Sequence, residues 1–195
     1  MEDWSKKIKI LTILLLFIFG RSYAQKEDDL VFIPDTTIGN VLKLRNSASV
    51  VGFFDGNIKY QESFDIEEPF VCFLNSDTSE YMIVYHFYGD LQNQFSLFEV
   101  AEIEREHKTY TCNYTKYDRF STESGIALGM GTEQLILIKG KPHSKLETDK
   151  VSVYKYSISK KDTTFLKRYK MPLYFAEYYF YENSLIRYQF GFEYP

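Results

Sequence analysis

The chain has 195 residues, of which 45% are hydrophobic and 26% are charged, with 23 Lys and Arg against 27 Asp and Glu. These values are typical of a folded domain and exclude a disordered chain, a collagen and a polytopic membrane protein. The 17 Tyr and 17 Phe are a heavy aromatic load, which favours β-strands.

The N-terminal segment has the features of a secretory signal peptide. Three lysines between residues 6 and 9 precede an apolar run at residues 10–20, and Ser22 and Ala24 supply the small side chains that suit cleavage after Ala24. The run is shorter than the roughly 20 residues of a membrane-spanning helix. We expect residues 1–24 to be removed and the protein to be periplasmic or secreted; a retained membrane anchor is the alternative.

Export changes the charge balance and the setting of the cysteines. Removal of the signal takes away four basic and two acidic side chains and leaves 19 against 25, a net charge of −6. We expect no nucleic-acid partner, because such binding depends on neutralising phosphates and the chain has no long basic run. In an oxidising compartment Cys72 and Cys112 form either a disulfide or two free buried thiols.

Most of the remaining chain alternates apolar and polar residues at period two, as half-buried strands do. Short turn sequences separate these segments, which favours antiparallel hairpins over parallel βαβ units. The expected strands are residues 70–74, 81–88, 95–103, 150–159, 173–181 and 185–194.

The alternation breaks at residues 44–56 and again at residues 128–140. Each break begins with Leu, passes a small polar residue suited to a helix N-cap (Ser47 and Thr132), and ends in Gly. We therefore expect a short helix in each break, although residues 135–138 suit a strand equally well on propensity alone.

Because expected strands follow both breaks, we interpret the chain as a duplicated unit. The first helix-plus-sheet repeat spans residues 25–106 and the second spans residues 107–195. The sequence thus predicts an α+β fold with antiparallel sheets, in which two tandem units of one short helix plus β-strands form two layers.

A resemblance supports the helices. Residues 122–142, TESGIALGMGTEQLILIKGKP, resemble the Gly-Ile-x-Leu-Gly-Met-Thr…Gly-x-Pro motif at the helix start of the BamE (SmpA/OmlA) family and of the β-lactamase-inhibitory-protein fold. The resemblance implies a short helix packed on an antiparallel sheet, in two tandem copies as in the inhibitory protein. It also implies a protein partner, either an envelope assembly machine or a secreted enzyme held inhibited. The chain departs from BamE in lacking a lipidation cysteine, and Arg45 and Asn46 replace the Gly-Met pair in the first copy.

The sequence offers little chemistry. His86, His107 and His143 lie far apart and lack Cys or His partners at metal-ligand spacing. Glu104-x-x-His107 follows a strand pattern in an acidic run that is typical of solvated surface. The sequence has no nucleophile elbow and no phosphate-binding glycine loop. We therefore expect a non-enzymatic protein without a metal or cofactor.

The last predicted hairpin carries the most informative pattern. In residues 185–194 one face is aromatic and the other polar, with Ile186 assigned to the core and Leu185 to the wet face. Its partner segment, residues 173–181, is aromatic on both faces. This pairing places aromatic side chains beside polar ones on the wet face, unless a second layer covers them.

We expect this wet face to bind a protein partner, because Tyr and Arg are enriched at binding hot spots. The expected contact residues are Phe175, Tyr179, Tyr181, Arg187 and Gln189. The alternative is a carrier of a small apolar ligand such as a lipid, in which these aromatic side chains line a cavity between sheet and helix.

Overall fold

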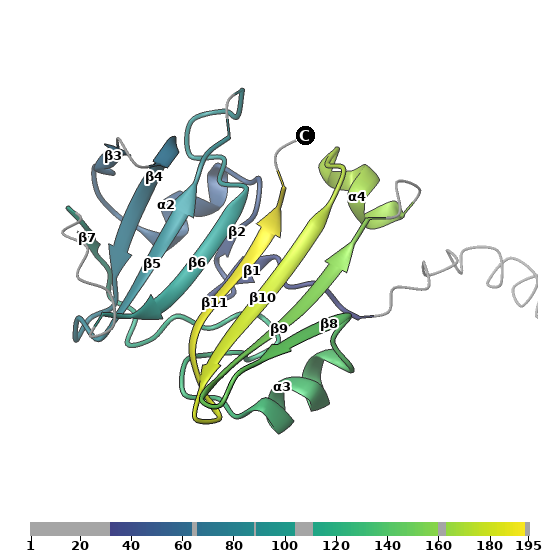
Figure 1. Ribbon diagram of the computed structural model, residues 1–195. Coiled ribbons are helices and arrows are strands. Elements are labelled where there is room, and N and C mark those ends of the chain that lie inside the picture. The colour runs from purple at the N-terminus through teal and green to yellow at the C-terminus, as the bar shows by residue number, and fades with distance from the viewer. Residues whose placement is uncertain (1–31, 64–65, 88, 104–110, 160–162, 194–195) are drawn as a thin grey trace, which may run out of the picture. The chain divides into compact units, whose positions relative to one another are not determined.

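A computed structural model of the chain describes residues 32–63, 66–87, 89–103, 111–159 and 163–193 (Figure 1). The predicted signal peptide at residues 1–24, the predicted repeat boundary at residues 106 and 107, and the Glu104-x-x-His107 motif lie outside these residues.

The described residues form short strands and three short helices. In chain order they are β1 (Thr37–Ile38), β2 (Leu42–Lys43), α2 (Ala48–Phe53), β3 (Tyr60–Ser63), β4 (Ile66–Leu74), β5 (Glu80–Tyr85), β6 (Leu97–Glu102), β7 (Asn113–Tyr114), α3 (Thr132–Lys139), β8 (Ser144–Glu147), β9 (Val151–Ile158), α4 (Thr164–Tyr169), β10 (Tyr174–Tyr181) and β11 (Ser184–Phe192). All six strands expected from the alternation are confirmed, with ends that differ by a few residues.

One sheet runs through both halves of the described chain. Its strand order is β3-β4-β5-β6-β11-β10-β9-β8, and all of these neighbours are antiparallel. β7 lies off this path and pairs in parallel with β4, which makes the sheet mixed. Two meanders, β3–β6 and β8–β11, therefore meet where β6 pairs with β11 (Figure 1).

The predicted α+β fold of two tandem helix-plus-sheet units in two layers is wrong. The protein is mostly β, with one continuous sheet and only three short helices among the described residues. The physical reason lies at the junction: the inner edge strands of the two meanders satisfy their backbone groups by pairing with each other. Helices of six to eight residues are also too short to form a layer over a sheet of this width.

A helix does lie inside each predicted break. α2 follows Ser47 at its N-cap, whereas the N-cap of α3 is Gly131 and not Thr132. Sequence reasoning missed α4, although its signal was present. The Thr163 side chain accepts a hydrogen bond from the backbone N–H of Leu166, as an N-cap residue does.

One face of the sheet, called the core face here, carries the hydrophobic core. Alternate side chains of β6, β9, β10 and β11 point to it, which leaves a run of large aromatic residues almost fully buried: Phe98, Tyr156, Tyr174, Tyr178, Phe180, Tyr188 and Phe190. The β1–β2 hairpin, α2 and irregular chain cover this face (Figure 1). Phe53 of α2 packs edge-on against Phe73, and the Tyr188 hydroxyl donates to the Phe120 carbonyl at 3.0 Å.

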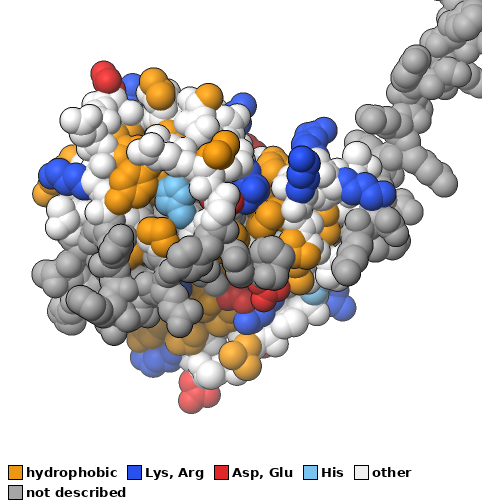
Figure 2. Space-filling model, turned by 90° about the horizontal axis from the view of Figure 1, so that it is seen from above, with side chains coloured by type: hydrophobic (Ala, Val, Ile, Leu, Met, Phe, Trp, Pro, Cys, Tyr) orange, Lys and Arg blue, Asp and Glu red, His pale blue; other side chains and the backbone are white. Residues whose placement is uncertain are grey.

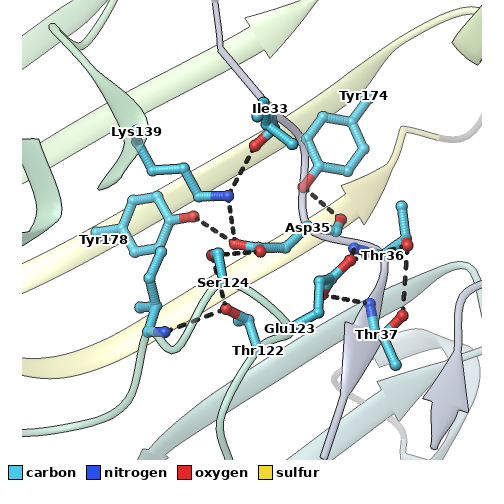
Figure 3. Close-up of polar contacts among 11 residues, drawn as sticks. Ile33, Asp35, Thr36, Thr37, Thr122, Glu123, Ser124, Lys139, Tyr174 and Tyr178 are labelled. Carbon is cyan, nitrogen blue, oxygen red and sulfur yellow. Dashed lines mark hydrogen bonds and ion pairs between the residues drawn. The ribbon is translucent and has the colours of Figure 1, made fainter. Parts of the chain in front are cut away.

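A buried ion pair fastens the start of the described chain to the core face (Figure 3). Asp35 Oδ2 lies 2.7 Å from Lys139 Nζ, and both side chains are 1% exposed. The Lys139 ammonium also donates to the Ile33 carbonyl at 2.7 Å, and the Ser124 hydroxyl donates to Asp35 Oδ1 at 2.6 Å. The Tyr174 hydroxyl donates to the Asp35 carbonyl at 2.7 Å. This satisfied network explains how a lysine of α3 is buried at all.

Candidate functional site: the open face of the sheet

The opposite face of the β9–β11 meander is called the open face here. It is defined by the following half-buried or exposed side chains: Lys155, Phe175, Glu177, Tyr179, Tyr181, Arg187 and Gln189. The register explains why they meet, because Tyr179 lies opposite Arg187 and Glu177 lies opposite Gln189. The structure thus brings all five sequence-predicted contact residues to one face, and their role in binding stays a prediction.

Glu177 is the centre of the open face, and the predicted set of contact residues did not include it. Its carboxylate lies 2.7 Å from Lys155 Nζ and accepts a hydrogen bond from Gln189 Nε2 at 3.0 Å. The Tyr179 hydroxyl also donates to Glu177. The alternation along β10 was the signal that places Glu177 among the predicted residues, since it lies two positions from both Phe175 and Tyr179.

Arg187 continues this polar row toward the first meander. Its Nη2 lies 3.0 Å from Glu99 Oε2 on β6, and the Tyr85 hydroxyl donates to the same oxygen at 3.3 Å. The guanidinium also lies 5.0 Å from the centre of the Tyr179 ring, which is a cation–π distance. A connected row of charges and aromatic rings therefore crosses β9, β10, β11, β6 and β5.

Burial and hydrogen bonding within the row determine the protonation states of Glu177 and Tyr179. Burial raises the pKa of Glu177, but the hydrogen bonds from Lys155, Tyr179 and Gln189 outweigh this and hold that pKa below its ordinary value. Burial and the hydrogen bond to Glu177 raise the pKa of Tyr179 above its ordinary value. At neutral pH the open face therefore presents an ionised Glu177 and a neutral Tyr179.

One predicted orientation at this hairpin is wrong. Leu185 is fully buried and Ile186 is partly exposed, whereas the alternation assigned Leu185 to the wet face and Ile186 to the core. The register of β10 and β11 shifts between Tyr179 and Phe180, so that Phe180 lies opposite Leu185. This β-bulge reverses the side-chain directions at the start of β11.

Apolar side chains border the open face at the edge of the sheet. Leu146 of β8 lies opposite Val153, which lies opposite Tyr179, so all three point to the same side. Leu146 is 63% exposed and Val151 is 37% exposed. Leu146 and Val151 therefore add exposed apolar area beside the polar row.

The same face of the first meander is closed. Phe70, Cys72, Tyr81, Ile83 and Ala101 form a buried apolar cluster there, with Cys112 packed against it. Cys72 and Cys112 are joined in a disulfide with their Cα atoms 4.5 Å apart.

Two adjoining hollows lie at the end of the first meander. Figure 2 views the molecule from above and shows hydrophobic side chains among polar ones on this surface. The two hollows have volumes of about 420 and 400 Å³ and share Tyr60 and Gln92. Val50 and Val51 of α2 line the first hollow and His86 lines the second. The predicted aromatic contact residues do not line either hollow.

The described residues show neither a metal-binding group nor a membrane-spanning helix. Within them no three His, Cys, Asp or Glu side chains come together as metal ligands would. No described helix is both long and apolar enough to cross a bilayer.

Comparison of the chain with protein-family models, with curated proteins and with solved structures gives no match. The resemblance of residues 122–142 to the BamE family and the β-lactamase-inhibitory-protein fold therefore stays a prediction.

Proposed function

We propose that this protein is an exported, non-enzymatic module of the cell envelope that binds a protein partner through the open face. The observation that carries the proposal is the row centred on Glu177, in which aromatic and charged side chains are held in place but only partly covered. Tyr and Arg side chains of this kind contribute large contact areas at hot spots, and their prior ordering lowers the entropy lost on binding.

The charges of the open face point to a particular kind of partner surface. Lys155 and Arg187 are already paired with Glu177 and Glu99, so the row offers little net charge to attract a strongly charged partner. We propose a partner that contributes uncharged polar groups and apolar side chains, which pack on Phe175, Tyr179 and Tyr181. Binding should then depend only weakly on salt concentration.

Site-specific photocrosslinking tests the proposal. A photoreactive benzoyl-phenylalanine replaces Tyr181 on the open face or, as a control, Val51, which is 77% exposed on α2 at the opposite side of the sheet (Figure 1). We expect position 181, and not position 51, to crosslink one envelope or secreted protein in the source cell. Binding of that purified partner should weaken at least tenfold in Y179A/Y181A and remain unchanged in V51A. Equal crosslinking at both positions, or undiminished binding of Y179A/Y181A, would contradict the proposal.

Export rests on the N-terminal sequence and on the disulfide. The lysines and the apolar run at residues 6–20 match a signal peptide, and a Cys72–Cys112 disulfide persists in oxidising compartments. Mass spectrometry of protein from the cell envelope or medium should give a chain that begins at Gln25. An intact Met1 in that fraction would favour a membrane anchor.

The hollows around Tyr60 favour a second candidate, a carrier of a small apolar ligand. The apolar part of their lining comes from α2 and the aromatic ring of Tyr60, whose centre lies 5.5 Å from that of the His86 ring. A panel of fatty acids and phospholipids tests this in a thermal-shift assay. A rise in Tm that Val51→Trp abolishes would support the carrier, because Val51 lines the first hollow at an exposed position, and no shift with any lipid would count against it.

A further inference from the structure

The sheet ends at β8, and no described strand pairs with its outer side. All four residues of β8 are exposed. A strand edge presents unpaired backbone N–H and C=O groups, which another strand can pair with.

The register shows which backbone groups point outward. The Thr148 N–H donates to the Val151 carbonyl at 2.8 Å, so these two residues form a hydrogen-bonded pair beside the turn. Such pairs alternate along an antiparallel ladder, and Leu146 and Val153 are therefore the next pair bonded toward β9. The N–H and C=O groups of Lys145 and Glu147 consequently point away from the sheet.

We propose that β8 pairs with β8 of a second copy of this chain, antiparallel and around a twofold axis at Leu146. Lys145 of each copy then lies opposite Glu147 of the other, and the outward backbone groups of these residues form the hydrogen bonds. Leu146 meets Leu146 of the second copy in the pair without hydrogen bonds, where opposing Cα atoms approach most closely. Opposite charges and an apolar contact thus coincide with the backbone pairing.

Charge selects this register over its neighbours. A slip that moves the axis to residue 145 places Lys145 opposite Lys145, and a slip to residue 147 places Glu147 opposite Glu147. With an axis halfway between two residues, the outward-pointing backbone groups of one copy lie opposite residues whose own N–H and C=O groups point inward to β9. The hydrogen bonds between the two copies are then lost. The order of basic, apolar and acidic residues in β8 is therefore complementary to itself, as an isologous interface requires.

Helix α3 supplies further apolar area next to this edge, because residues 140–143 join it directly to β8. It buries Leu135 and Lys139 while Ile136, Leu137 and Ile138 are 41%, 86% and 37% exposed. A four-residue strand pair alone falls short of the roughly 1,000 Å² of a specific interface. With the exposed apolar side chains of α3 added, we place the dissociation constant in the range of about 10–100 µM.

The dimer would extend the open face. A twofold axis perpendicular to a sheet keeps equivalent faces on the same side, so the two open faces become neighbours on one continuous sheet. This pairing does not depend on the proposed protein partner, and the test below needs none.

Charge reversal tests the pairing in solution by sedimentation velocity and equilibrium at about 5–500 µM, which spans the expected dissociation constant. The native protein should approach the dimer mass at the highest concentrations. K145E alone and E147K alone should each remain monomeric, because each places like charges opposite one another. A mixture of K145E with E147K should form a heterodimer, and the double variant K145E/E147K should dimerise again.

Matched controls separate this contact from a general effect of charge. Glu182 is 60% exposed in the turn between β10 and β11, and β9 separates β10 from β8, so E182K should dimerise like the native chain. Leu146→Lys, at an exposed position, places like charges on the axis and should abolish the dimer, and circular dichroism verifies that each variant is folded. A native monomer at every concentration overturns the proposal, as does a mixture of the two single variants that stays monomeric.

Discussion

The two halves of the sheet differ in how far their side chains are buried on the face opposite the core face. On the first meander the face carries a buried apolar cluster around Phe70 and Ile83, closed by the Cys72–Cys112 disulfide. On the second meander it carries the partly covered row centred on Glu177. Since the strands of both halves belong to one continuous sheet, the backbone does not decide which half is closed.

The difference shows where binding capacity lies. A closed apolar cluster contributes its free energy to folding, whereas an ordered but open row keeps contact area for a partner. Variants of the first half should therefore change stability most, and variants of the open face should change stability least.

Loss of the disulfide should have the largest effect. Its sequence separation is 40 residues, for which the chain-entropy model gives about 4 kcal/mol. C72S/C112S should lose about this much free energy of unfolding in urea titrations and should bind the dye ANS as the cluster opens. Reductant should bring the native protein to the same level and leave the variant unchanged. Equal stability of the native protein with and without reductant would contradict the prediction.

The junction between the two halves should be the next most sensitive point. Gly191 of β11 packs so closely on β6 that an added Cβ would lie 2.3 Å from the Ser96 carbonyl oxygen and 2.7 Å from Leu97 Cα. Because both neighbours are backbone atoms, Gly191→Ala should shift the strands and cost about 2–3 kcal/mol. Gly131→Ala is the control, since its nearest neighbour is 3.7 Å away, and it should cost less than about 1 kcal/mol. Similar urea midpoints for the two variants would contradict this account.

The contrast between the two halves also shows how much of the fold can be predicted from the sequence. The period-two alternation located β9, β10 and β11 because each has one mainly buried face, and it placed Tyr179, Arg187 and Gln189 on the same side. Strands β5 and β6 are buried on both faces. The alternation could not show that β6 and β11 pair, because a contact between residues 97 and 191 leaves no local pattern. The same limit led to the wrong two-unit fold.

Other features of the site also depend on distant neighbours. The bulge at Tyr179 and Phe180 reverses the direction of the Leu185 side chain, and no Gly or Pro at this point of the sequence indicates it. β8 was missed because Ser144–Glu147 is too polar and too short to show alternation. The Asp35–Lys139 pair joins two residues that resemble solvated surface residues in sequence, and only their burial gives them a structural role.

His86 gives the first half a pH response near neutrality. Burial lowers its pKa below the ordinary value of 6.5, although Asp90 opposes the shift. Below pH 6.5 the unfolded chain therefore binds a proton at His86 more readily than the folded chain does. The contribution of neutral His86 to the free energy of unfolding is full above pH 6.5 and is lost as the pH falls below that value. The free energy of unfolding should fall between pH 7 and 5 by less than Gly191→Ala costs. His86→Phe keeps a ring beside Tyr60 and Phe95 and should remove this step; an unchanged pH profile would contradict it.

Glu177 makes the stability of the open face depend on pH in a lower range, and we expect its effect on the free energy of unfolding to be the smallest of those considered. Its folded-state pKa lies below the ordinary value of 4.5, so the folded chain keeps the carboxylate ionised where the unfolded chain already binds a proton. Its contribution is therefore complete above pH 4.5 and is lost as the pH falls further. Glu177→Gln should cost about 1 kcal/mol at pH 7 and flatten the acid limb of the stability profile, while leaving the His86 step intact.

Glu182→Gln is the matched control for Glu177→Gln, since its carboxylate is 60% exposed and also pairs with a lysine. It should leave the native profile unchanged, because an exposed pair contributes little. Partner binding separates the two roles of Glu177: if the row orders Tyr179 and Gln189 for contact, Glu177→Gln should weaken binding by more than its small loss of stability explains. Full binding with a flattened acid limb would show that the carboxylate only stabilises the fold, and would leave the aromatic side chains alone as the contact.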